Sequence, residues 1–275
     1  MDIDGKTAIV TGAGSGIGRG LAISLAKSGM NVVLVGHHQP PLDDTAAAIL
    51  AMGGKSVTVT ADVSKLDDVQ RVANEAIRAF GAVHLLCNNA GIGPFASTAE
   101  TTIAEWEWVL SVNLWGVIHG IHVFLPIFEA QGEGHINATA SESGLYGTPY
   151  LAAYNTSKFA VIGLMQSLAR DLRATQSDVT ASVLCPGAVK THILDSARER
   201  PDTAQRPVEV SAETHAFRDL VNDAVANGMP PEDVAACVVD GIRKGQFWIF
   251  SHDHVPETAF KQSEAMLYER RLIDL

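Results

Sequence analysis

A tyrosine and a lysine four residues apart are the pair in this sequence best suited to proton transfer. Tyr154 and Lys158 lie in the run YNTSK, where a spacing of four puts both side chains on one face of a helix. A phenol has a pKa of about 10, too high for efficient proton exchange at neutral pH. An ammonium group about 4 Å away, at an effective dielectric constant of about 20, would bring that pKa to about 7. The spacing predicts an acid–base pair, and an exposed Tyr and Lys that merely share a helix face is the alternative.

A glycine-rich turn near the N-terminus predicts a phosphate-binding loop. The run TGAGSGIG covers residues 11–18, follows a short apolar strand and opens a helix. Its glycines Gly12, Gly16 and Gly18 let backbone N–H groups approach a pyrophosphate, and the helix N-terminus adds the positive end of its dipole. The spacing differs from G-x-G-x-x-G, and a plain tight turn is the alternative. Its position after the first strand of an α/β series favours nucleotide binding.

Polar or glycine-rich residues also follow four later strands. Each group could be an ordinary turn, because Asn, Asp and Gly are common turn residues. Ligands of an open α/β sheet bind outside the carboxyl ends of the strands, so the coincidence of five such groups predicts one binding crevice there. The four later groups are Asp62–Val63, Asn88–Gly91, Ser141, and Pro186–Gly187 with Thr191.

The elements that position these residues alternate between strands and helices. Amphipathic stretches between the strands predict helices, and Ser64 is expected to cap the helix that Gly81 closes. Right-handed strand–helix–strand crossovers then give an α/β fold, a doubly wound parallel sheet with helices on both faces. Without a repeat or a linker, residues 1–275 are expected to form a single dinucleotide-binding and catalytic domain. The predicted strands are residues 7–11, 31–35, 56–61, 83–87, 134–139 and 180–184, with a later candidate at 247–250.

Residues 190–231 break this rhythm. The strand period vanishes after the sixth strand, and prolines such as Pro201 and Pro230 interrupt mixed-charge sequence. A long irregular insertion in a compact domain is usually a functional lid or a tolerated surface loop. Its position directly after a strand end favours a substrate lid, with residues 232–275 supplying a C-terminal strand and helices.

Composition and charge exclude several kinds of partner. The 275 residues carry 20 Lys and Arg against 31 Asp and Glu, a net charge of −11, without a basic block. Nucleic acids and anionic membranes attract clustered positive charge, so neither is expected as a partner. We expect no apolar stretch of the roughly 18 to 20 residues that span a membrane, and no secretion signal. The cysteines Cys87, Cys185 and Cys237 are odd in number and set in apolar contexts, which favours a soluble, cytoplasmic protein.

Two groups of histidines could be taken for metal ligands. His119 and His122 share a helix face, and His252 lies close in sequence to His254. Neither group has a third ligand at a diagnostic spacing. We therefore expect surface or interface histidines and no metal site.

These motifs, in this order, are identified as those of the short-chain dehydrogenase/reductase family, in its shorter single-domain branch. The resemblance covers roughly residues 4–190 and implies a Rossmann-type fold, a nicotinamide dinucleotide and hydride transfer between an alcohol and a ketone. It also implies a homodimer or homotetramer, assembled through the helix that carries Trp106 and Trp108 and the helix of Tyr154. The matching positions are residues 11–18, Asp62, residues 88–91, Asn113, Ser141, Tyr154, Lys158 and residues 186–191.

The resemblance implies four catalytic residues. Tyr154 would be the general acid in ketone reduction and the general base in alcohol oxidation. Lys158 would lower the pKa of Tyr154 and hydrogen-bond the nicotinamide ribose. Ser141 would donate a hydrogen bond to the substrate oxygen and stabilise the charge that develops there. Asn113 would interrupt its helix and hold a water that links Lys158 to solvent.

The same resemblance implies a set of cofactor-binding residues. Asp62 and Val63 would contact the adenine ring, Asn89 and Gly91 would line the cofactor cleft, and Thr191 would hold the nicotinamide amide. The full set is Gly12, Ser15, Gly16, Ile17, Gly18, Gly36, His37, His38, Asp62, Val63, Asn89, Ala90, Gly91, Tyr154, Lys158, Pro186, Gly187, Val189 and Thr191.

The end of the second strand bears on which dinucleotide is used. An acidic residue there would bind the adenosine ribose hydroxyls and repel a 2′-phosphate. This position reads Gly36–His37–His38, without an acid, and His37 stands where phosphate-selecting relatives often place arginine. The sequence favours NADP(H). NAD(H) is the alternative, because histidine is mostly neutral at pH 7 and Ser15 is not basic.

The candidate substrate pocket is apolar. Residues 93–95, residues 143–150 and the lid combine apolar and aromatic side chains with few charges, which favours a hydrophobic secondary alcohol or ketone over a sugar or an anion. The C-terminal tail loosely resembles that of relatives that act on ring-bearing alcohols and ketones. This resemblance implies that the substrate carries a ring. Arg198, Arg200 and Arg206 could clamp a carboxylate, but the acids among them favour a solvated mixed-charge surface.

A catalytically idle, dinucleotide-binding regulator of the same fold is the main alternative. Such a protein has no reason to retain Asn113, Ser141, Tyr154 and Lys158 together at working spacing. A sugar-nucleotide epimerase or dehydratase would carry a larger C-terminal domain than the about 85 residues after Thr191 supply. The sequence therefore predicts an oxidoreductase.

Overall fold

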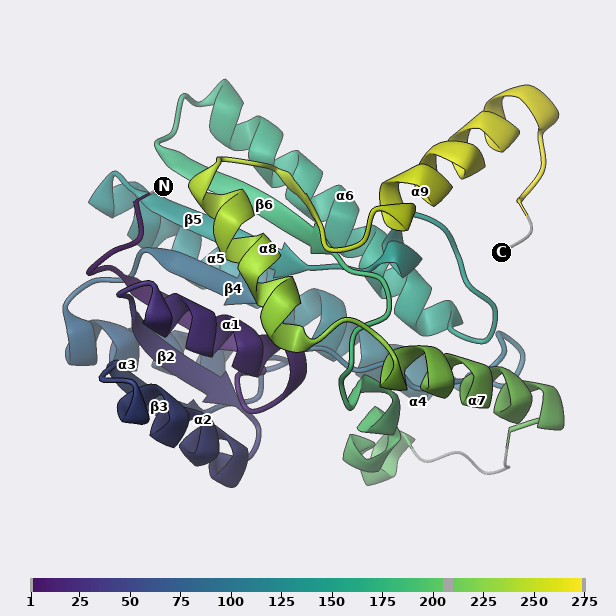
Figure 1. Cartoon of the computed structure of the whole chain (residues 1–275), viewed down its shortest axis with the longest axis horizontal. Coiled ribbons are helices and arrows are strands. Elements are labelled where there is room, and N and C mark those ends of the chain that lie inside the picture. Colours follow the sequence, from purple (N-terminus) through teal and green to yellow (C-terminus); the bar gives the residue numbers. More distant parts are fainter. Residues whose placement is uncertain (1, 205–209, 274–275) are drawn as a thin grey trace.

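A single parallel sheet organises the computed structural model, which describes residues 2–204 and 210–273 (Figure 1). The side chains of residues 197 and 198 lie outside this description. Over the described ranges the sheet has seven strands in the order β3-β2-β1-β4-β5-β6-β7, so the order reverses between β1 and β4. The strands are β1 (Thr7–Thr11), β2 (Asn31–Gly36), β3 (Ser56–Thr60), β4 (Leu85–Asn88), β5 (Gly134–Thr139), β6 (Val179–Cys185) and β7 (Trp248–Phe250).

Helices cover both faces of this sheet because its strands are apolar on both sides. Successive side chains of a strand point to opposite faces, so Ile9 packs in one core and Val10 in the other. One face is covered by α1 (Gly16–Lys27), α2 (Gln39–Ala51) and α8 (Pro231–Arg243). The other is covered by α3 (Leu66–Phe80), α5 (Gly116–Gln131) and α6 (Ala152–Ala174). The α/β Rossmann-type fold predicted from the sequence is confirmed.

Most strand boundaries lie within one residue of the sequence prediction, and two local features differ more. Strand β4 begins at Leu85, later than expected. The prediction that Ser64 caps α3 is wrong, because Lys65 occupies the N-cap and no side chain caps the helix. The Ser64 hydroxyl instead donates to Asp62 Oδ1 at 2.7 Å. Ser64 thus orients the Asp62 carboxylate at the end of β3 and makes no hydrogen bond that caps α3.

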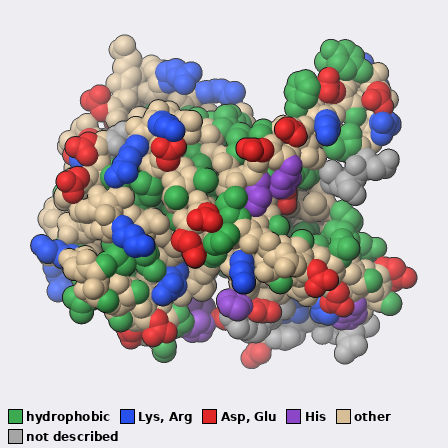
Figure 2. All heavy atoms as spheres, in the orientation of Figure 1, with side chains coloured by type: hydrophobic (Ala, Val, Ile, Leu, Met, Phe, Trp, Pro, Cys, Tyr) green, Lys and Arg blue, Asp and Glu red, His purple; other side chains and the backbone are tan. Residues whose placement is uncertain are grey.

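A long apolar helical run precedes β5. It comprises α4 (Ile103–Leu110), a π-helical turn at Ser111–Trp115 and α5. The whole run of 29 residues is long and apolar enough to cross a membrane, which corrects the expectation that no stretch would be. Core helices of water-soluble proteins satisfy the same criterion, and Phe124 and Phe128 are buried against the sheet. Figure 2 shows acidic and basic side chains interspersed over one face, without a basic patch in the described part of that face.

Residues 190–231 run from the end of β6 to the start of α8. Their described part contains the 3-10 helices η3 (Ile193–Glu199) and η4 (Asp202–Ala204) and the helix α7 (Ala212–Ala226). Pro207 lies outside the described residues. After β7 the chain forms α9 (His254–Glu264), which projects from the body in Figure 1, and the turn Ala265–Glu269.

Candidate active site

A cavity of about 890 Å³ lies at the carboxyl ends of the strands, beside the reversal of strand order. All but two of the residues predicted to act in catalysis or cofactor binding line it. Gly18 and Asn113 lie behind its wall. The predicted residues that line the cavity are Gly12, Ser15, Gly16, Ile17, Gly36, His37, His38, Asp62, Val63, Asn89, Ala90, Gly91, Ser141, Tyr154, Lys158, Pro186, Gly187, Val189 and Thr191.

The glycine turn is shaped for a close approach of backbone to ligand. Gly12 and Gly16 have φ values of +67° and +50°, a region that favours glycine. A Cβ on Gly18 would lie 2.1 Å from the Gly12 carbonyl oxygen, so the turn closes only with glycine there. Ser15 is the N-cap of α1 and makes no side-chain cap, which leaves the first N–H groups of the helix for a ligand. This cradle fits the pyrophosphate of a dinucleotide.

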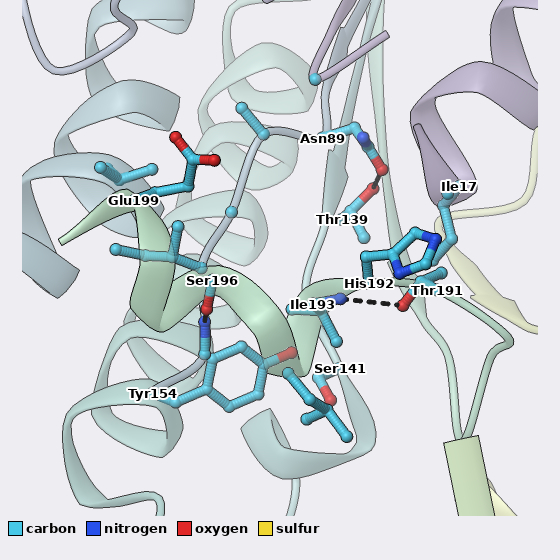
Figure 3. A pocket seen from close by; sticks show the side chains of 18 of the residues that line it. Ile17, Asn89, Thr139, Ser141, Tyr154, Thr191, His192, Ile193, Ser196 and Glu199 are labelled. Carbon is cyan, nitrogen blue, oxygen red and sulfur yellow. Dashed lines mark hydrogen bonds between the residues drawn. The ribbon is translucent and has the colours of Figure 1, made fainter. Parts of the chain in front are cut away.

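Thr11 and Asn89 join the ends of β1 and β4. Thr11 Oγ1 accepts hydrogen bonds from the N–H groups of Asn89 at 2.9 Å and Ala90 at 3.0 Å. The Asn89 side chain donates to the Thr11 carbonyl at 3.0 Å, and its oxygen accepts from the Thr139 hydroxyl at 3.2 Å (Figure 3). The floor of the cavity is therefore held by hydrogen bonds that reach the backbone of two strands.

The hydroxyls of Tyr154 and Ser141 face each other in the cavity (Figure 3). Tyr154 lies in the first turn of α6, and Ser141 caps a short 3-10 helix, where its Oγ accepts from Ser143 N–H at 3.2 Å. Burial chiefly raises the pKa of Tyr154, the hydrogen bond with Ser141 lowers it and the charge of Glu142 raises it, which together bring it to about 12. The phenol is thus buried and paired with a second hydroxyl.

Lys158 approaches Tyr154 from the face of its ring. Its Nζ lies 5.5 Å from the centre of the Tyr154 ring and donates to the Thr139 carbonyl at 2.8 Å. The ammonium therefore faces the ring and a backbone oxygen, and burial is the largest influence on the pKa of Tyr154. Burial also lowers the pKa of Lys158 to about 8, against a raising influence from Cys185. The lowering of the tyrosine pKa by Lys158 stays a prediction.

Asn113 interrupts its helix, as the family resemblance implies. It lies in the π-helical turn between α4 and α5 and is 1% exposed. Its Oδ1 accepts from Ile92 N–H at 2.8 Å, while Nδ2 donates to the Ile92 carbonyl at 2.8 Å and to Ser157 Oγ at 3.0 Å. The side chain thus ties the loop after β4 to the helix of Tyr154. The water that Asn113 is expected to hold stays a prediction.

Carboxylates stand beside both histidines at the end of β2. His37 Nε2 lies 4.0 Å from Asp62 Oδ2, and His38 Nε2 lies 2.8 Å from Glu199 Oε2. Burial raises the pKa of Asp62, but hydrogen bonds from Ser64 and the nearby charges of His37 and Lys65 leave it below its usual value. His37, His38 and Glu199 are exposed. Each offers a ring nitrogen or a carboxylate oxygen of the kind that binds metal ions, and these atoms lie within 4.8 Å of one another. They form the outer wall of the cavity.

Comparison with known proteins decides the family. A family model described as short chain dehydrogenase matches residues 6–202. The chain belongs to the short-chain dehydrogenase/reductase family. As a member, it is an oxidoreductase that uses a nicotinamide dinucleotide.

The relatives of this dehydrogenase match between 74% and 100% of its chain. The crystal structure of a short-chain dehydrogenase/reductase from Burkholderia phymatum in complex with NAD is 38% identical, with a TM-score of 0.96, and covers 100% of this chain and 99% of that one. The CLA biosynthesis dehydrogenase/reductase of Lactiplantibacillus plantarum is 31% identical over 255 residues, 91% of this chain and 89% of the relative. The cyclohexanol dehydrogenase of Acinetobacter sp. (strain SE19) is 34% identical over 204 residues, 74% of this chain and 80% of the relative.

Sequence reasoning did not place two helices of this dehydrogenase in the cavity wall: α4, which it assigned to subunit contact, and α7, which it did not recognise. Helix α4 contributes Trp108 from one side, and α7 contributes an apolar face from the other. The signal for α7 is present in the sequence, because its lining residues recur at helical spacing within the 190–231 segment. These residues are Phe217, Val221, Ala224 and Val225.

Arg200 joins the 190–231 segment to α4. Its guanidinium lies 2.8 Å from Glu105 Oε1, and the two side chains are 12% and 1% exposed. It also lies over the Trp108 ring, with Cζ 5.7 Å from the ring centre. The expectation of a solvated mixed-charge surface is therefore wrong for Arg200, because α4 buries it; Arg206 and the Arg198 side chain lie outside the described residues.

Two further contacts hold the same segment over the cavity. Ser196 Oγ accepts from Gly93 N–H at 2.9 Å, beside the Tyr154 ring (Figure 3). Glu100 accepts from Ser211 N–H at 2.6 Å and from the Thr214 hydroxyl at 2.7 Å, at the N-terminus of α7. These hydrogen bonds hold the pKa of Glu100 far below its usual value. Together with the contact of Glu199 with His38, these side chains anchor the segment over the cavity.

Three of the four histidines singled out in the sequence, His119, His252 and His254, have hydrogen-bond partners. His119 Nδ1 lies 3.0 Å from the Val63 carbonyl oxygen. His252 Nδ1 accepts from Gly187 N–H at 3.2 Å. His254 Nε2 lies 3.2 Å from Glu142 Oε2, which also accepts from the Tyr146 hydroxyl at 2.7 Å. Each therefore supports a strand-end loop.

Proposed function

We propose that this dehydrogenase interconverts a hydrophobic, ring-bearing secondary alcohol and its ketone. The observation that carries the proposal is the Tyr154–Ser141 hydroxyl pair, which faces a large cavity whose far wall is apolar. The wall from Trp108 to Phe217 offers van der Waals contact and few charges to a substrate. Similarity to a cyclohexanol dehydrogenase supports a ring in that substrate.

The chain's own residues hold the reacting oxygen and move its proton. In reduction, Tyr154 Oη gives its proton to the carbonyl oxygen, and in oxidation it removes the proton of the alcohol. Ser141 donates a hydrogen bond to the same oxygen and stabilises the negative charge that develops on it. Lys158 holds the helix of Tyr154 against the end of β5, and Asn113 holds it against the loop after β4. The bound nicotinamide supplies or accepts the hydride at the carbon that bears this oxygen.

The cofactor would lie along the floor of the cavity. The glycine turn and the N-terminus of α1 would bind the pyrophosphate, and Asp62 with Val63 would flank the adenine. Asn89 and Gly91 would line the nicotinamide half. Val189 and Thr191 would hold the nicotinamide amide, and the Oγ1 of Thr191 lies 3.5 Å from the N–H of Ile193 (Figure 3). In support of this assignment, all these groups line one continuous cavity.

NADP(H) is the first candidate for the cofactor, because no acidic residue stands at the end of β2. Gly36 leaves room there and two histidines follow it. NAD(H) is the second candidate, favoured by the carboxylates of Asp62 and Glu199 beside those histidines and by the NAD complex of the Burkholderia phymatum relative. Both candidates use the same floor and differ at the adenosine ribose.

The proposal includes the architecture around the site. Residues 1–275 act as one dinucleotide-binding and catalytic domain, with residues 190–231 as its substrate lid. The chain assembles as a homodimer or homotetramer, and the exposed Trp115 and Phe159, on the run α4–α5 and on α6, would lie in the contact. We infer a cytoplasmic location from the family and the acidic composition. No nucleic acid or membrane is part of the proposal.

A ketone panel tests the activity. Purified protein is mixed with NADPH or NADH and with cyclic ketones, acyclic ketones of equal carbon number, and cyclic ketones that carry a carboxylate, and absorbance of the reduced cofactor is followed. We expect the neutral cyclic ketones to react fastest. Preference for the carboxylated ketones would overturn the substrate class. Cofactor binding without turnover of any ketone or alcohol would favour the idle regulator, which no described contact otherwise supports.

A further inference from the structure

A lid residue reaches the adenosine end of the cavity. Glu199 is the last residue of η3, on the same short helix as Ile193 and Ser196 (Figure 3). Its Oε2 lies 2.8 Å from Nε2 of His38, a residue 161 positions earlier, in the turn between β2 and α2. Both residues line the cavity. The lid therefore brings a carboxylate to the turn where the adenosine ribose of the cofactor would lie.

The two carboxylates at this turn are held in different ways. Asp62 follows β3 and is fixed by Ser64, whose N–H and hydroxyl both donate to Oδ1. Glu199 lies on the lid, and its described contact at this turn is the one with His38. Displacing Glu199 from His38 would move a residue of the lid, whereas displacing Asp62 would disturb the end of a strand.

A 2′-phosphate and the Glu199 carboxylate require the same partner. Both are anions that bind a protonated imidazole by a charge-assisted hydrogen bond. Nε2 of His38 can donate its hydrogen bond to only one of these anions. A 2′-phosphate and the Glu199 carboxylate held beside the same ring would also repel each other. The ribose hydroxyl of NAD(H) is neutral and can donate a hydrogen bond to a carboxylate. Occupation of His38 by Glu199 is thus compatible with NAD(H) and opposed to NADP(H).

We propose that Glu199 determines the cofactor preference by competing with the 2′-phosphate of NADP(H) for His38. The lid supplies the acidic group that the end of β2 lacks, so it weakens the preference for NADP(H) that Gly36–His37–His38 would otherwise give. This inference rests on the proposed function of the cavity floor as the dinucleotide site.

Binding of the cofactors without substrate tests the inference. Wild type and Glu199→Gln, which keeps the length and one oxygen acceptor but removes the charge, are titrated with NADPH and NADH at one fixed salt concentration by calorimetry or tryptophan fluorescence. We expect the Kd for NADPH to fall about tenfold in the variant and the Kd for NADH to change less than twofold. A ratio of the two Kd values that stays within twofold of wild type would overturn the inference.

Two control variants separate competition for His38 from a general charge effect. Asp202→Asn removes one charge from the same lid at an exposed residue outside the cavity lining, and we expect its Kd ratio to match wild type. In a His38→Ala background, Glu199→Gln should change the NADPH Kd less than threefold. A tenfold change in either control would overturn the competition.

The same titrations distinguish the two levels of failure. If wild-type protein binds neither dinucleotide, both the proposed function and this inference are wrong. If it binds both and Glu199→Gln leaves the ratio of the two Kd values unchanged, this inference alone is wrong and the dinucleotide site is supported.

Discussion

The floor and the lid of the cavity are built by different kinds of contact. In the floor, the side chains of Thr11 and Asn89 hydrogen-bond to the backbone at the ends of two neighbouring strands, and Gly18 packs against the Gly12 carbonyl. In the lid, the chief contact is an ion pair between two distant side chains, Arg200 and Glu105. The floor is therefore tied to the sheet itself, whereas the lid depends on side chains that other segments supply. The floor sets what every member of such a family must bind, and the lid is free to set what one member selects.

Loss of the Tyr154 hydroxyl should have the largest effect and should leave both regions in place. Tyr154→Phe keeps the ring that packs near Gly93 but removes the proton donor. We expect kcat to fall by about 10³-fold, within the range for a lost general acid, with cofactor Kd values within twofold of wild type. Steady-state rates and cofactor titration measure the two effects. Tyr268→Phe, on the exposed C-terminal turn, should retain full activity; equal losses in both variants would contradict the assignment.

A methyl group on the floor should be the next most damaging change. Gly18→Ala puts a Cβ 2.1 Å from the Gly12 carbonyl oxygen, so the turn has to move. We expect a loss of about 1–3 kcal/mol in the free energy of unfolding and at least tenfold in cofactor affinity. Thermal unfolding and cofactor titration provide the measurement.

The control for this change is Gly163→Ala. A Cβ at this helical position in α6 meets no atom within 4 Å, and alanine is the better helix former. We expect a gain of up to about 1 kcal/mol and unchanged affinity. If the two glycine variants lost affinity equally, the floor would not be as intolerant as we describe.

Breaking the ion pair should affect the lid and spare the floor. Arg200→Leu leaves the buried Glu105 without its cationic partner, which is unfavourable inside a protein. We expect kcat/KM to fall about tenfold, mainly through KM of the ketone, with cofactor Kd changing less. Limited proteolysis should cut the lid sooner than in wild type. The double variant Arg200→Leu with Glu105→Leu should recover most of the stability, because apolar residues can replace a buried ion pair.

Acid should loosen the lid before it reaches the floor. Hydrogen bonds from Ser211, Ser97 and Thr214 hold the pKa of Glu100 far below its reference value of 4.5. A depressed carboxyl pKa stabilises the fold above the unfolded pKa, and that contribution disappears as pH falls through the folded value. We expect severalfold faster pepsin cleavage of the lid only at pH well below 4.5. Glu100→Gln should show the faster cleavage already at the highest pH of the assay. A cleavage rate equal to that of wild type would contradict the role of Glu100 in anchoring the lid.

Removal of the charge beside Ser141 should have the smallest effect. Glu142 raises the pKa of Tyr154, so Glu142→Gln should lower it and shift the pH profile of alcohol oxidation to lower pH by less than one pH unit. The measurement is log kcat/KM against pH for wild type and variant. A shift to higher pH would show that lost contacts with Tyr146 and His254 outweigh the lost charge.

Most of the floor could be predicted from the sequence because its signals are local. The glycine turn, Asn89 and Tyr154 each lie next to the strand or helix that positions them, and periodicity reveals those elements. The helical face of α7 was recognisable in the same way, from the spacing of Phe217 and Val221, but proline-interrupted neighbours obscured it. Ser64 was mistaken for a cap because the same residue type also serves to orient a carboxylate, as it does with Asp62.

The sequence by itself determined that the chain forms a parallel sheet, and it determined which residues gather at the carboxyl ends of the strands. Only the tertiary structure decided that Tyr154 is buried deeply enough to raise its pKa, and that Arg200 is buried against Glu105. It alone brought Glu199 to His38. The physical reason is that periodicity and turn chemistry act between neighbours in the chain, whereas desolvation and ion pairing depend on which distant side chains share one small volume.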